Sequence, residues 1–253
     1  MAFAQAIFEK CWPRWQQHFS PDARLRLGCV SLAALADCTD EVASIYLGTD
    51  ELGRWSGFSQ KKRRGEWLGG RLAAKWAAAE LLGKTAVDWQ DVVIRNEEDG
   101  RPYVATDAQA LAPFISISHS GQLAAALAAN FPCGLDIQQP GPNILRVKKR
   151  FVLREEEDIL TASLPETFTE TERLTMLWAA KEAVRKAVRT SPLLGLLEIR
   201  LHAGHGDGAP QEPLALTFAS GRAQDGCPAS ISVLCFFADN LAWAMACLPT
   251  PKE

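Results

Sequence analysis

A single carboxylate, Asp136, stands inside an apolar segment of the chain, GLDIQ at residues 134–138. The segment has the composition of a strand, and burying a carboxylate there without a charged partner or a metal ion would be costly. Upstream, His119 lies among three serines in the stretch SISHS, residues 116–120. Asp136 and His119 are therefore candidates for a functional site, although a histidine hydrogen-bonded to a serine is an alternative for His119 that needs no ligand.

A second stretch, WAAKEAVRKA at residues 178–187, concentrates charged side chains at helical spacing. One face of the predicted helix carries a tryptophan and three charged residues, Trp178, Lys181, Glu182 and Arg185. Lys186 follows Glu182 by one turn. Two interpretations are open: a solvated helix face with a Glu182–Lys186 ion pair worth a few tenths of a kcal/mol, or a set of charges that acts together with Asp136.

A third group of charges is basic. A helix is predicted over residues 65–82, because apolar residues recur there at helical spacing and Gly83 is a suitable C-cap. The run KKRR precedes it at residues 61–64, and Arg71 and Lys75 lie one turn apart on one of its faces. These cations form either a solvated basic surface or a local site for anions.

The segments that would position these residues alternate between strands and helices. Strands are predicted at 24–35, at 91–104 on either side of a turn, and at several places in 195–248; helices are predicted at 143–160 and 171–188. The run LAAALAAN at 123–130 has the helix propensity of alanine but the length of a strand, so periodicity alone does not decide it.

These elements predict an α+β fold with two similar halves, each an antiparallel sheet packed with a long helix. The boundary is placed near residue 131, so that residues 1–130 carry the basic helix and His119 and residues 131–253 carry Asp136 and Glu182.

One segment of the second half, HAGHGDGAPQEP at residues 202–213, is predicted to be a flexible surface loop. Its His202, His205 and Asp207 could suggest a metal site, but a solvated loop is the favoured interpretation.

Composition limits the class of protein. The chain has 253 residues, 47% of them hydrophobic, and a net charge of −3 at pH 7, so no bulk charge attracts nucleic acid or an anionic membrane. Seven scattered cysteines without a Cys-x-x-Cys pair indicate neither a zinc site nor a disulfide framework. The N-terminus lacks a signal-peptide pattern, and the longest apolar run, 123–129, is too short to span a bilayer. We therefore expect a cytoplasmic protein with reduced, mostly buried thiols.

Taken together, the motifs resemble those of the 4′-phosphopantetheinyl transferase superfamily. The family patterns G-[IVL]-D-[IVL]-E and W-x-x-K-E-A-x-x-K are similar to residues 134–138 and 178–186. The family motifs Gly-Lys-Pro and N-[IV]-S-H-S are similar to residues 100–102 and 116–120. Four motifs in the family's order make the resemblance specific, and the chain length is similar to that of the larger, monomeric, surfactin-synthetase-activating type.

The resemblance implies transfer of 4′-phosphopantetheine from coenzyme A to a serine of an apo acyl or peptidyl carrier protein, with release of 3′,5′-ADP. Asp136, Gln138 and Glu182 would hold Mg²⁺ or Mn²⁺, because such an ion takes a few carboxylates together with water and phosphate oxygens. Glu182 or a metal-bound water would accept the serine proton. Lys186, with Lys181, would stabilise the leaving 3′,5′-ADP. The active site would lie in the cleft between the two halves.

The resemblance also places the coenzyme A phosphates at His119 and Ser118, with Arg101 where the family has a lysine. Three phosphates need several cations. The basic helix is predicted to supply three for the 3′-phosphate: Arg64, Arg71 and Lys75. Residues 123–130 become a strand by the same resemblance, and no nucleic-acid or membrane partner is expected.

Two departures from the family pattern bear on this assignment. Gln138 stands where the family usually has an acid; its carbonyl can ligate Mg²⁺ directly or through water but adds no charge. Ser116 and Arg101 replace the family's Asn and Lys, and Arg101 keeps the charge and can bind a phosphate with two nitrogens. The alternatives are a non-catalytic protein of the same fold that binds coenzyme A or a carrier, and an unrelated α+β protein. The motifs leave open which carrier is used.

Overall fold

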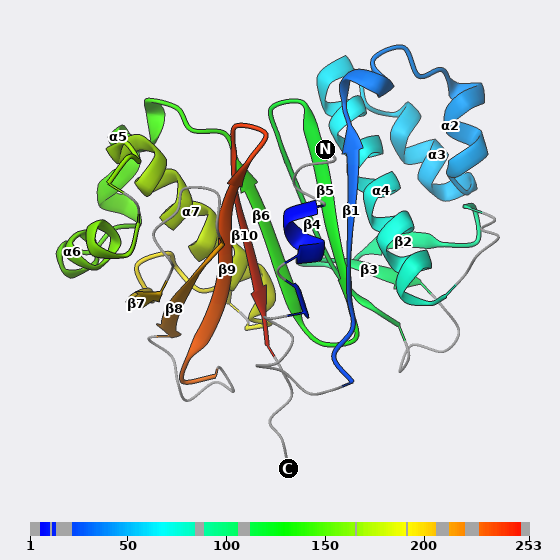
Figure 1. Ribbon diagram of the computed structural model, residues 1–253. Helices are drawn as coiled ribbons and strands as arrows, with labels where there is room; N and C mark the ends of the chain where they lie inside the picture. Colours follow the sequence, from blue (N-terminus) through cyan, green and yellow to red (C-terminus); the bar gives the residue numbers. More distant parts are fainter. Residues whose placement is uncertain are drawn as a thin grey trace. The chain divides into compact units, whose positions relative to one another are not determined.

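The computed structural model describes residues 6–10, 12–13, 22–83, 89–105, 112–164, 166–190, 192–205, 213–220 and 228–248. The chain divides into two compact units, residues 22–131 and residues 132–253, and the described N-terminal residues group with the second unit. Each unit contains one antiparallel sheet of five strands with helices packed against it (Figure 1). The predicted α+β fold with two similar halves is therefore confirmed.

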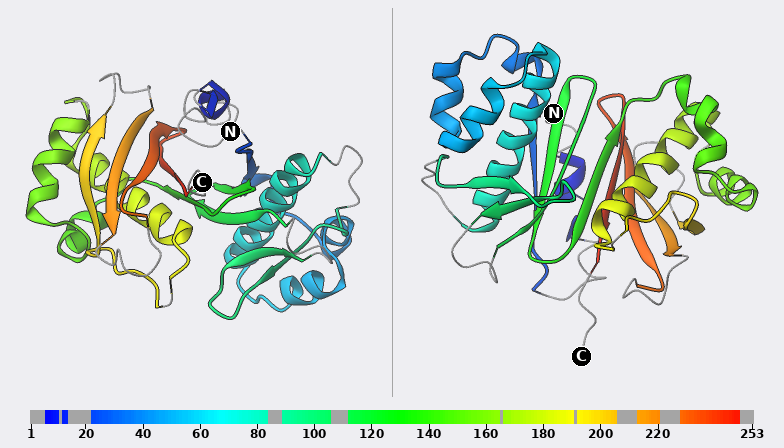
Figure 2. Two further views of the ribbon diagram at one scale, coloured as in Figure 1. Left: turned by 90° about the horizontal axis from the view of Figure 1, so that it is seen from below. Right: turned by 180° about the vertical axis from the view of Figure 1, so that it is seen from behind.

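In the first unit the sheet has the order β1-β5-β4-β3-β2. Its strands are β1 (Leu25–Ser31), β2 (Val93–Asn96), β3 (Pro102–Ala105), β4 (Phe114–Ser120) and β5 (Leu123–Ala129). Its helices are the 3-10 turn η1 (Ala33–Leu35), α2 (Asp40–Tyr46), α3 (Thr49–Ser56) and α4 (Lys61–Leu81). Helix α4 packs against β5, β1 and β4, so one long helix covers one face of the sheet (Figure 2).

The run at 123–129 forms strand β5, as the family resemblance predicts and against its helix propensity. All seven of its residues are buried. β5 pairs with β1 on one side and β4 on the other, so that Leu25 and Phe114 both stand opposite Ala129. Pairing on both edges satisfies the backbone of β5, and this tertiary context outweighs the intrinsic preference of alanine.

The second unit repeats this plan with the sheet order β6-β10-β9-β8-β7. Its strands are β6 (Cys133–Gln138), β7 (Ile199–His205), β8 (Leu214–Ser220), β9 (Ile231–Ala238) and β10 (Leu241–Cys247). Its helices are α5 (Asn143–Val147), the 3-10 turn η3 (Lys148–Arg150), α6 (Arg154–Ser163) and α7 (Glu170–Ala187). Helix α7 packs against β6 and β10. Within the part of the chain that the structure describes, no helix has the length and apolar character needed to cross a membrane.

The single helix predicted at 143–160 is instead broken between η3 and α6. Phe151 is fully buried at the break. A new helix begins after Leu153, whose backbone N–H donates to the Glu156 carboxylate (2.8 Å). This bond satisfies a backbone donor before the first turn of α6, which allows a new helix to begin there.

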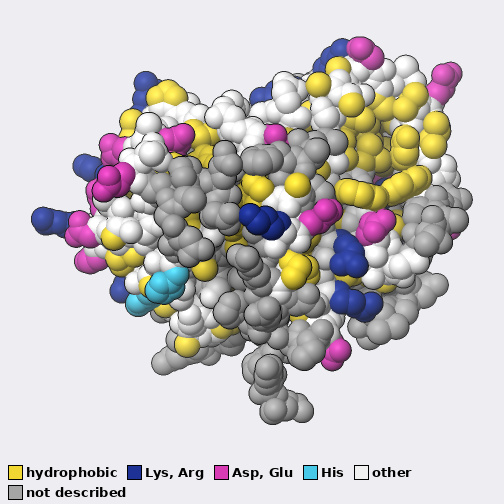
Figure 3. Space-filling view, in the orientation of Figure 1, with side chains coloured by type: hydrophobic (Ala, Val, Ile, Leu, Met, Phe, Trp, Pro, Cys, Tyr) yellow, Lys and Arg dark blue, Asp and Glu magenta, His cyan; other side chains and the backbone are white. Residues whose placement is uncertain are grey.

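The loop predicted at 202–213 is also shorter than expected, because residues 202–205 belong to β7. His202 and His205 are exposed on this edge strand, and Figure 3 shows histidine side chains at the surface there. Asp207 lies outside the described residues. Among those described, no group of three or more His, Cys, Asp or Glu side chains is arranged to hold a metal ion.

Helix α7 lies directly on strand β6 because position 134 has no side chain. A Cβ at Gly134 would lie 2.7 Å from the backbone nitrogen of Ala187 and closer still to the carbonyl oxygen of Ala183. The first unit has the same contact, since a Cβ at Gly28 on β1 would meet the carbonyl of Ala73 on α4. In each unit an edge strand and a long helix thus approach backbone to backbone.

Two cysteines of the second unit face each other across neighbouring strands. Cys133 on β6 stands directly opposite Cys247 on β10, and both are buried. Burial raises the pKa of the Cys133 thiol to about 12 and also raises that of Cys247. Both thiols are therefore protonated at neutral pH and poorly nucleophilic.

We predict that Gly134→Ala lowers the free energy of unfolding by about 1–3 kcal/mol or more, because the added methyl overlaps the backbone of α7. Gly141→Ala is the matched control, since a Cβ there meets nothing within 4 Å, and we expect it to change the free energy of unfolding by less than about 1 kcal/mol. Urea denaturation followed by circular dichroism measures both. Equal denaturation midpoints for the two variants would contradict the close approach.

Candidate functional site

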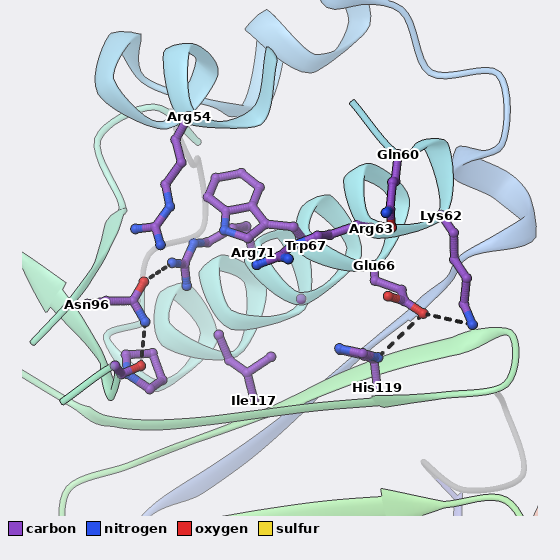
Figure 4. A pocket seen from close by; sticks show the side chains of 13 residues that line it. Arg54, Gln60, Lys62, Arg63, Glu66, Trp67, Arg71, Asn96, Ile117 and His119 are labelled. Atoms are coloured by element: carbon purple, nitrogen blue, oxygen red, sulfur yellow. Dashed lines mark hydrogen bonds and ion pairs between the residues drawn. The ribbon is translucent and has the colours of Figure 1, made fainter. Parts of the chain in front are cut away.

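The first unit contains a pocket of about 640 Å³ between α3, α4, the β2–β3 connection and β4. Four of its lining residues are cations: Arg54, Lys62, Arg63 and Arg71. Trp67 and Ile117 give it an apolar wall, and Glu66 is the carboxylate among its lining residues (Figure 4). The excess of positive charge beside an aromatic ring suits an anionic ligand with an apolar or aromatic part.

Arg71 is the most buried cation of this pocket, at 5% exposed. Its guanidinium lies 4.8 Å from the centre of the Trp67 ring, and its NH2 group donates to Asn96 Oδ1. Its Nε is buried and has no hydrogen-bond partner. Burial lowers the pKa of Arg71 to about 10; Glu51 opposes this and Arg54 adds to it. At neutral pH Arg71 is thus a buried cation that lines a candidate anion pocket, and its contact with a phosphate stays a prediction.

His119 lies at the rim of the same pocket, on β4, with its side chain 47% exposed. Its Nδ1 is 3.8 Å from Glu66 Oε1, and Lys62 Nζ is 3.8 Å from the same oxygen. Ile117 also lines the pocket, whereas Ser118 is buried and does not line it. Successive side chains of a strand point to opposite faces, so Ser118 is directed away from the face that carries His119.

Arg64 lies outside the 640 Å³ pocket. It lines a neighbouring hollow of the first unit, where its guanidinium stacks on the Trp55 ring at 3.7 Å and pairs with Asp40. Arg101 is bonded to Asp99, with Nε 2.9 Å from Oδ2, and stands between two residues that line the pocket, Gly100 and Pro102. Arg101 is therefore adjacent to the pocket, and Arg64 is separate from it.

Lys75 has a structural environment that does not suit the predicted contact with a phosphate. Its side chain is fully buried, with Nζ 2.6 Å from Glu51 Oε2 and donating to the carbonyl oxygen of Trp89 (2.8 Å). Glu51 also accepts from the backbone N–H groups of Gly48 (3.3 Å) and Ile94 (3.2 Å). Lys75 therefore neutralises a carboxylate that ties α3 to β2, and it leaves the set of candidate ligand-binding residues.

The pocket also contains residues that the sequence did not single out as ligand contacts, namely Arg54, Arg63, Trp67 and Asn96. Arg63 belongs to the basic run at 61–64, so the sequence could have indicated it as a ligand contact. Arg54 and Asn96 come from α3 and the end of β2, and no motif marks them. Their proximity to α4 follows only from the fold.

In the second unit the structure brings Asp136 and Lys186 together. Lys186 Nζ donates to Asp136 Oδ1 (2.7 Å) and to the carbonyl oxygen of Leu135 (2.8 Å). Gly134, Asp136 and Gln138 alternate onto one face of β6, and Gly134 contacts α7. The Asp136 side chain is 10% exposed and that of Lys186 31%, so the pair lies at the edge of the core with access to solvent.

Glu182 lies one turn before Lys186 on α7. Arg185 NH1 is 3.3 Å from Glu182 Oε1, and the Glu182 side chain is 19% exposed. A solvated helix face would have a Glu182–Lys186 ion pair. The structure instead pairs Glu182 with Arg185 and Asp136 with Lys186. Each carboxylate thus has one oxygen in an ion pair, and the two basic side chains are neighbours in the sequence.

Lys181 has a different role from its neighbours on α7. Its side chain is fully buried, and Nζ donates to Glu156 Oε2 (2.7 Å) and to the carbonyl oxygen of Phe151 (2.6 Å). The other Glu156 oxygen accepts from the backbone N–H of Leu201 on β7 (2.7 Å). Burial lowers the pKa of Lys181, and the bond to Glu156 opposes that shift. A fully buried ammonium with these partners holds the fold together and does not suit contact with the leaving group.

The family match to this chain lies in the second unit. Residues 132–220 match the family described as the 4′-phosphopantetheinyl transferase superfamily. The holo-[acyl-carrier-protein] synthase of Staphylococcus carnosus is 37% identical over 83 residues, which are 32% of this chain and 69% of that protein. The protein of the same name from Bacillus subtilis is 33% identical over 99 residues, 38% of this chain and 81% of that protein.

Solved structures of proteins with that name are also similar. The Bacillus anthracis protein in complex with CoA (3′,5′-ADP) is 26% identical, with a TM-score of 0.38, and the match covers 42% of this chain and 92% of that one. The Helicobacter pylori protein in complex with coenzyme A is 17% identical, with a TM-score of 0.35, covering 42% and 97%.

We predict that Lys181→Met lowers the free energy of unfolding by about 3–5 kcal/mol, because it leaves the Glu156 carboxylate buried without its cation. Arg185→Met is the control on the same helix; its side chain is 34% exposed and its partner Glu182 lies one turn away on α7, so we expect a loss of about 1 kcal/mol or less. Urea denaturation measures both. If Lys181→Met unfolds at the wild-type urea concentration, the structural role of Lys181 is refuted.

Proposed function

Because this chain belongs to the 4′-phosphopantetheinyl transferase superfamily, as its identity to the relatives above shows, we propose that it transfers 4′-phosphopantetheine from coenzyme A to a serine of an apo carrier protein. The transfer releases 3′,5′-ADP and gives the protein holo-[acyl-carrier-protein] synthase activity. The observation that carries this proposal is the meeting of Asp136 on β6 with Lys186 on α7. Both residues lie in the region that matches the family, and each comes from one of its two paired motifs.

The donor set of the second unit fits a divalent cation such as Mg²⁺. Asp136 offers a nearly buried carboxylate and Glu182 a partly exposed one, and Gln138 offers a neutral amide oxygen on the same strand face as Asp136. Mg²⁺ keeps several waters and takes only one or two carboxylates alongside phosphate oxygens, so this small set is sufficient. When bound, the ion would neutralise negative charge on the pyrophosphate of coenzyme A.

The chain's own side chains supply the remaining chemistry in this proposal. Glu182 accepts the proton of the attacking serine hydroxyl, since its carboxylate is partly exposed and lies one turn from Lys186 on α7. Lys186 is held beside Asp136 by two hydrogen bonds and stabilises the charge that develops on the leaving 3′,5′-ADP. Lys181, in contrast, holds α7 in place through Glu156 and acts on the reaction only by fixing the helix that carries Glu182.

The pocket of the first unit is the proposed site for the nucleotide end of coenzyme A. Its four cations balance phosphate charge locally, although the whole chain has a net charge of −3. Arg71 is the strongest candidate because it is the most buried cation that lines the pocket, and His119 stands at the rim. Arg101 remains a candidate beside the pocket. Arg64 and Ser118 are weaker candidates, because one lies in a separate hollow and the other is directed to the opposite face of the sheet.

The test of this function is mass spectrometry of an apo acyl carrier protein incubated with the full chain, coenzyme A and Mg²⁺. We expect the carrier to gain one phosphopantetheine group, and Asp136→Asn to slow this gain by at least about 100-fold, the scale of losing one group aimed at the reacting centre. Asp158→Asn on the exposed surface of α6 is the matched control and should keep the wild-type rate. If no carrier in a panel of acyl and peptidyl carriers is modified, while the chain still binds coenzyme A, the non-catalytic alternative would be favoured.

We further predict that Gln138→Glu lowers the Mg²⁺ concentration required for half-maximal transfer, because the site gains a charged oxygen ligand. The maximal rate need not rise, since the added negative charge also opposes the pyrophosphate. Transfer rate and Mg²⁺ binding by calorimetry are measured for both forms. Gln139→Glu adds the same charge one residue further on, so equal effects of the two substitutions would indicate long-range electrostatics and not ligation by residue 138.

A further inference from the structure

We propose that Asn96 is a positioning residue that orients Arg71 toward the ligand pocket and couples it to the turn carrying Arg101. The inference rests on the proposed binding of coenzyme A in this pocket. Asn96 ends β2, and its side chain lies between Arg71 on α4 and the chain at Gly100 (Figure 4). It is a neutral amide in a pocket whose other polar side chains are mainly charged.

The hydrogen bonds of Asn96 determine which way its amide faces. Asn96 Nδ2 donates to the carbonyl oxygen of Gly100 (2.6 Å). A carbonyl can only accept, so the amide nitrogen must point to Gly100 and Oδ1 must point to the other side. There Oδ1 accepts from Arg71 NH2. The turn thus fixes the amide, and the amide fixes the guanidinium.

The turn itself is well determined, which makes it a suitable support. Glu97 N–H donates to the carbonyl oxygen of Arg101 (2.8 Å), and Gly100 N–H donates to that of Glu97 (3.0 Å). Gly100 has a φ of +90°, a conformation that glycine adopts readily. The same turn carries Arg101 and leads into Pro102 at the pocket wall, so Asn96 connects two of the predicted ligand-binding positions.

The arrangement leaves defined donors of Arg71 for a ligand. Asn96 accepts one N–H of NH2, and the guanidinium carbon lies 4.8 Å from the centre of the Trp67 ring. A guanidinium offers its donors in a planar fork that binds a phosphate with two nitrogens. Fixing one nitrogen therefore fixes the plane in which the others meet a phosphate oxygen.

An amide is better suited to this position than a carboxylate. Aspartate would also accept from Arg71, but it would neutralise the cation and would set a negative oxygen against the carbonyl of Gly100. Asn96 orients the guanidinium and leaves its charge available to the ligand. Glu51 already acts on Arg71 from the core side, so a second carboxylate would leave less positive charge for a phosphate.

The experiment is a double-mutant cycle on coenzyme A binding, measured by isothermal titration calorimetry with the full chain. The cycle compares wild type, Asn96→Ala, Arg71→Ala and the double variant. We expect Asn96→Ala to weaken binding by about 10- to 100-fold in the wild-type background, the scale of a hydrogen bond to a charged group. In the Arg71→Ala background the same substitution should change the Kd by less than about twofold. A loss of equal size in both backgrounds would overturn the proposal, because it would mean that Asn96 acts only on the fold.

Asn96→Asp is a second test that keeps the size of the side chain. We expect it to weaken coenzyme A binding as well, since it removes the net positive charge of the Arg71 pair. Wild-type affinity in this variant would overturn the argument for a neutral amide. This variant keeps the proposal testable should Asn96→Ala fail to fold.

Asn130→Ala is the matched control for losing a structural amide. Asn130 accepts from the backbone N–H of Arg24 (2.8 Å) and donates to the carbonyl oxygen of Asp22 (2.9 Å), in the same unit and outside the pocket. It should leave the Kd for coenzyme A unchanged within about twofold. Absence of coenzyme A binding by the wild-type chain would overturn the proposed function and this inference together. Binding by wild type with no response to Asn96 would overturn only the inference.

Discussion

The absence of a side chain at Gly134 is the constraint on which the second unit depends. It lets α7 rest directly on β6 at Ala183 and Ala187. Strand alternation then places Asp136 on the same face, where Lys186 reaches it at 2.7 Å. The first unit uses the same device at Gly28, but Val30 stands two residues further on, in place of an acid. One packing solution therefore serves both units, and only one of them is equipped with a carboxylate at this contact.

A second feature shared by the two units fixes the rotation of each long helix about its own axis. In each unit a buried lysine of the long helix pairs with a buried glutamate from the short helix before it: Lys75 with Glu51, and Lys181 with Glu156. Each glutamate also accepts a backbone N–H from an edge strand, β2 or β7. A buried charge pair is weak as a source of stability but strict about geometry. It thereby sets which residues of α4 and α7 remain at the surface.

The fold class and the two long helices α4 and α7 could be predicted from the sequence. So could the proximity of Asp136 to the charged residues of α7. The prediction failed at Lys75 and Lys181, which helical spacing placed beside ligand-binding neighbours. Spacing identifies a shared face but does not say whether that face meets the core, and the glutamates that bury these lysines lie 24 and 25 residues away in the sequence. Asn96 could not be found for a similar reason, since its role depends on a turn and a helix that only the tertiary structure brings together.

The two buried thiols of the second unit, Cys133 and Cys247, make it possible to measure how often strand β6 separates from β10. Cys133 begins the strand that carries Asp136, and Cys247 faces it on β10. With their pKa values raised by burial, these thiols react with an alkylating reagent only when the two strands separate. Their labelling rate is therefore a native-state measure of how often the edge strand opens. Comparing that rate with and without coenzyme A and a divalent cation would show whether ligands suppress this local unfolding, without any introduced probe.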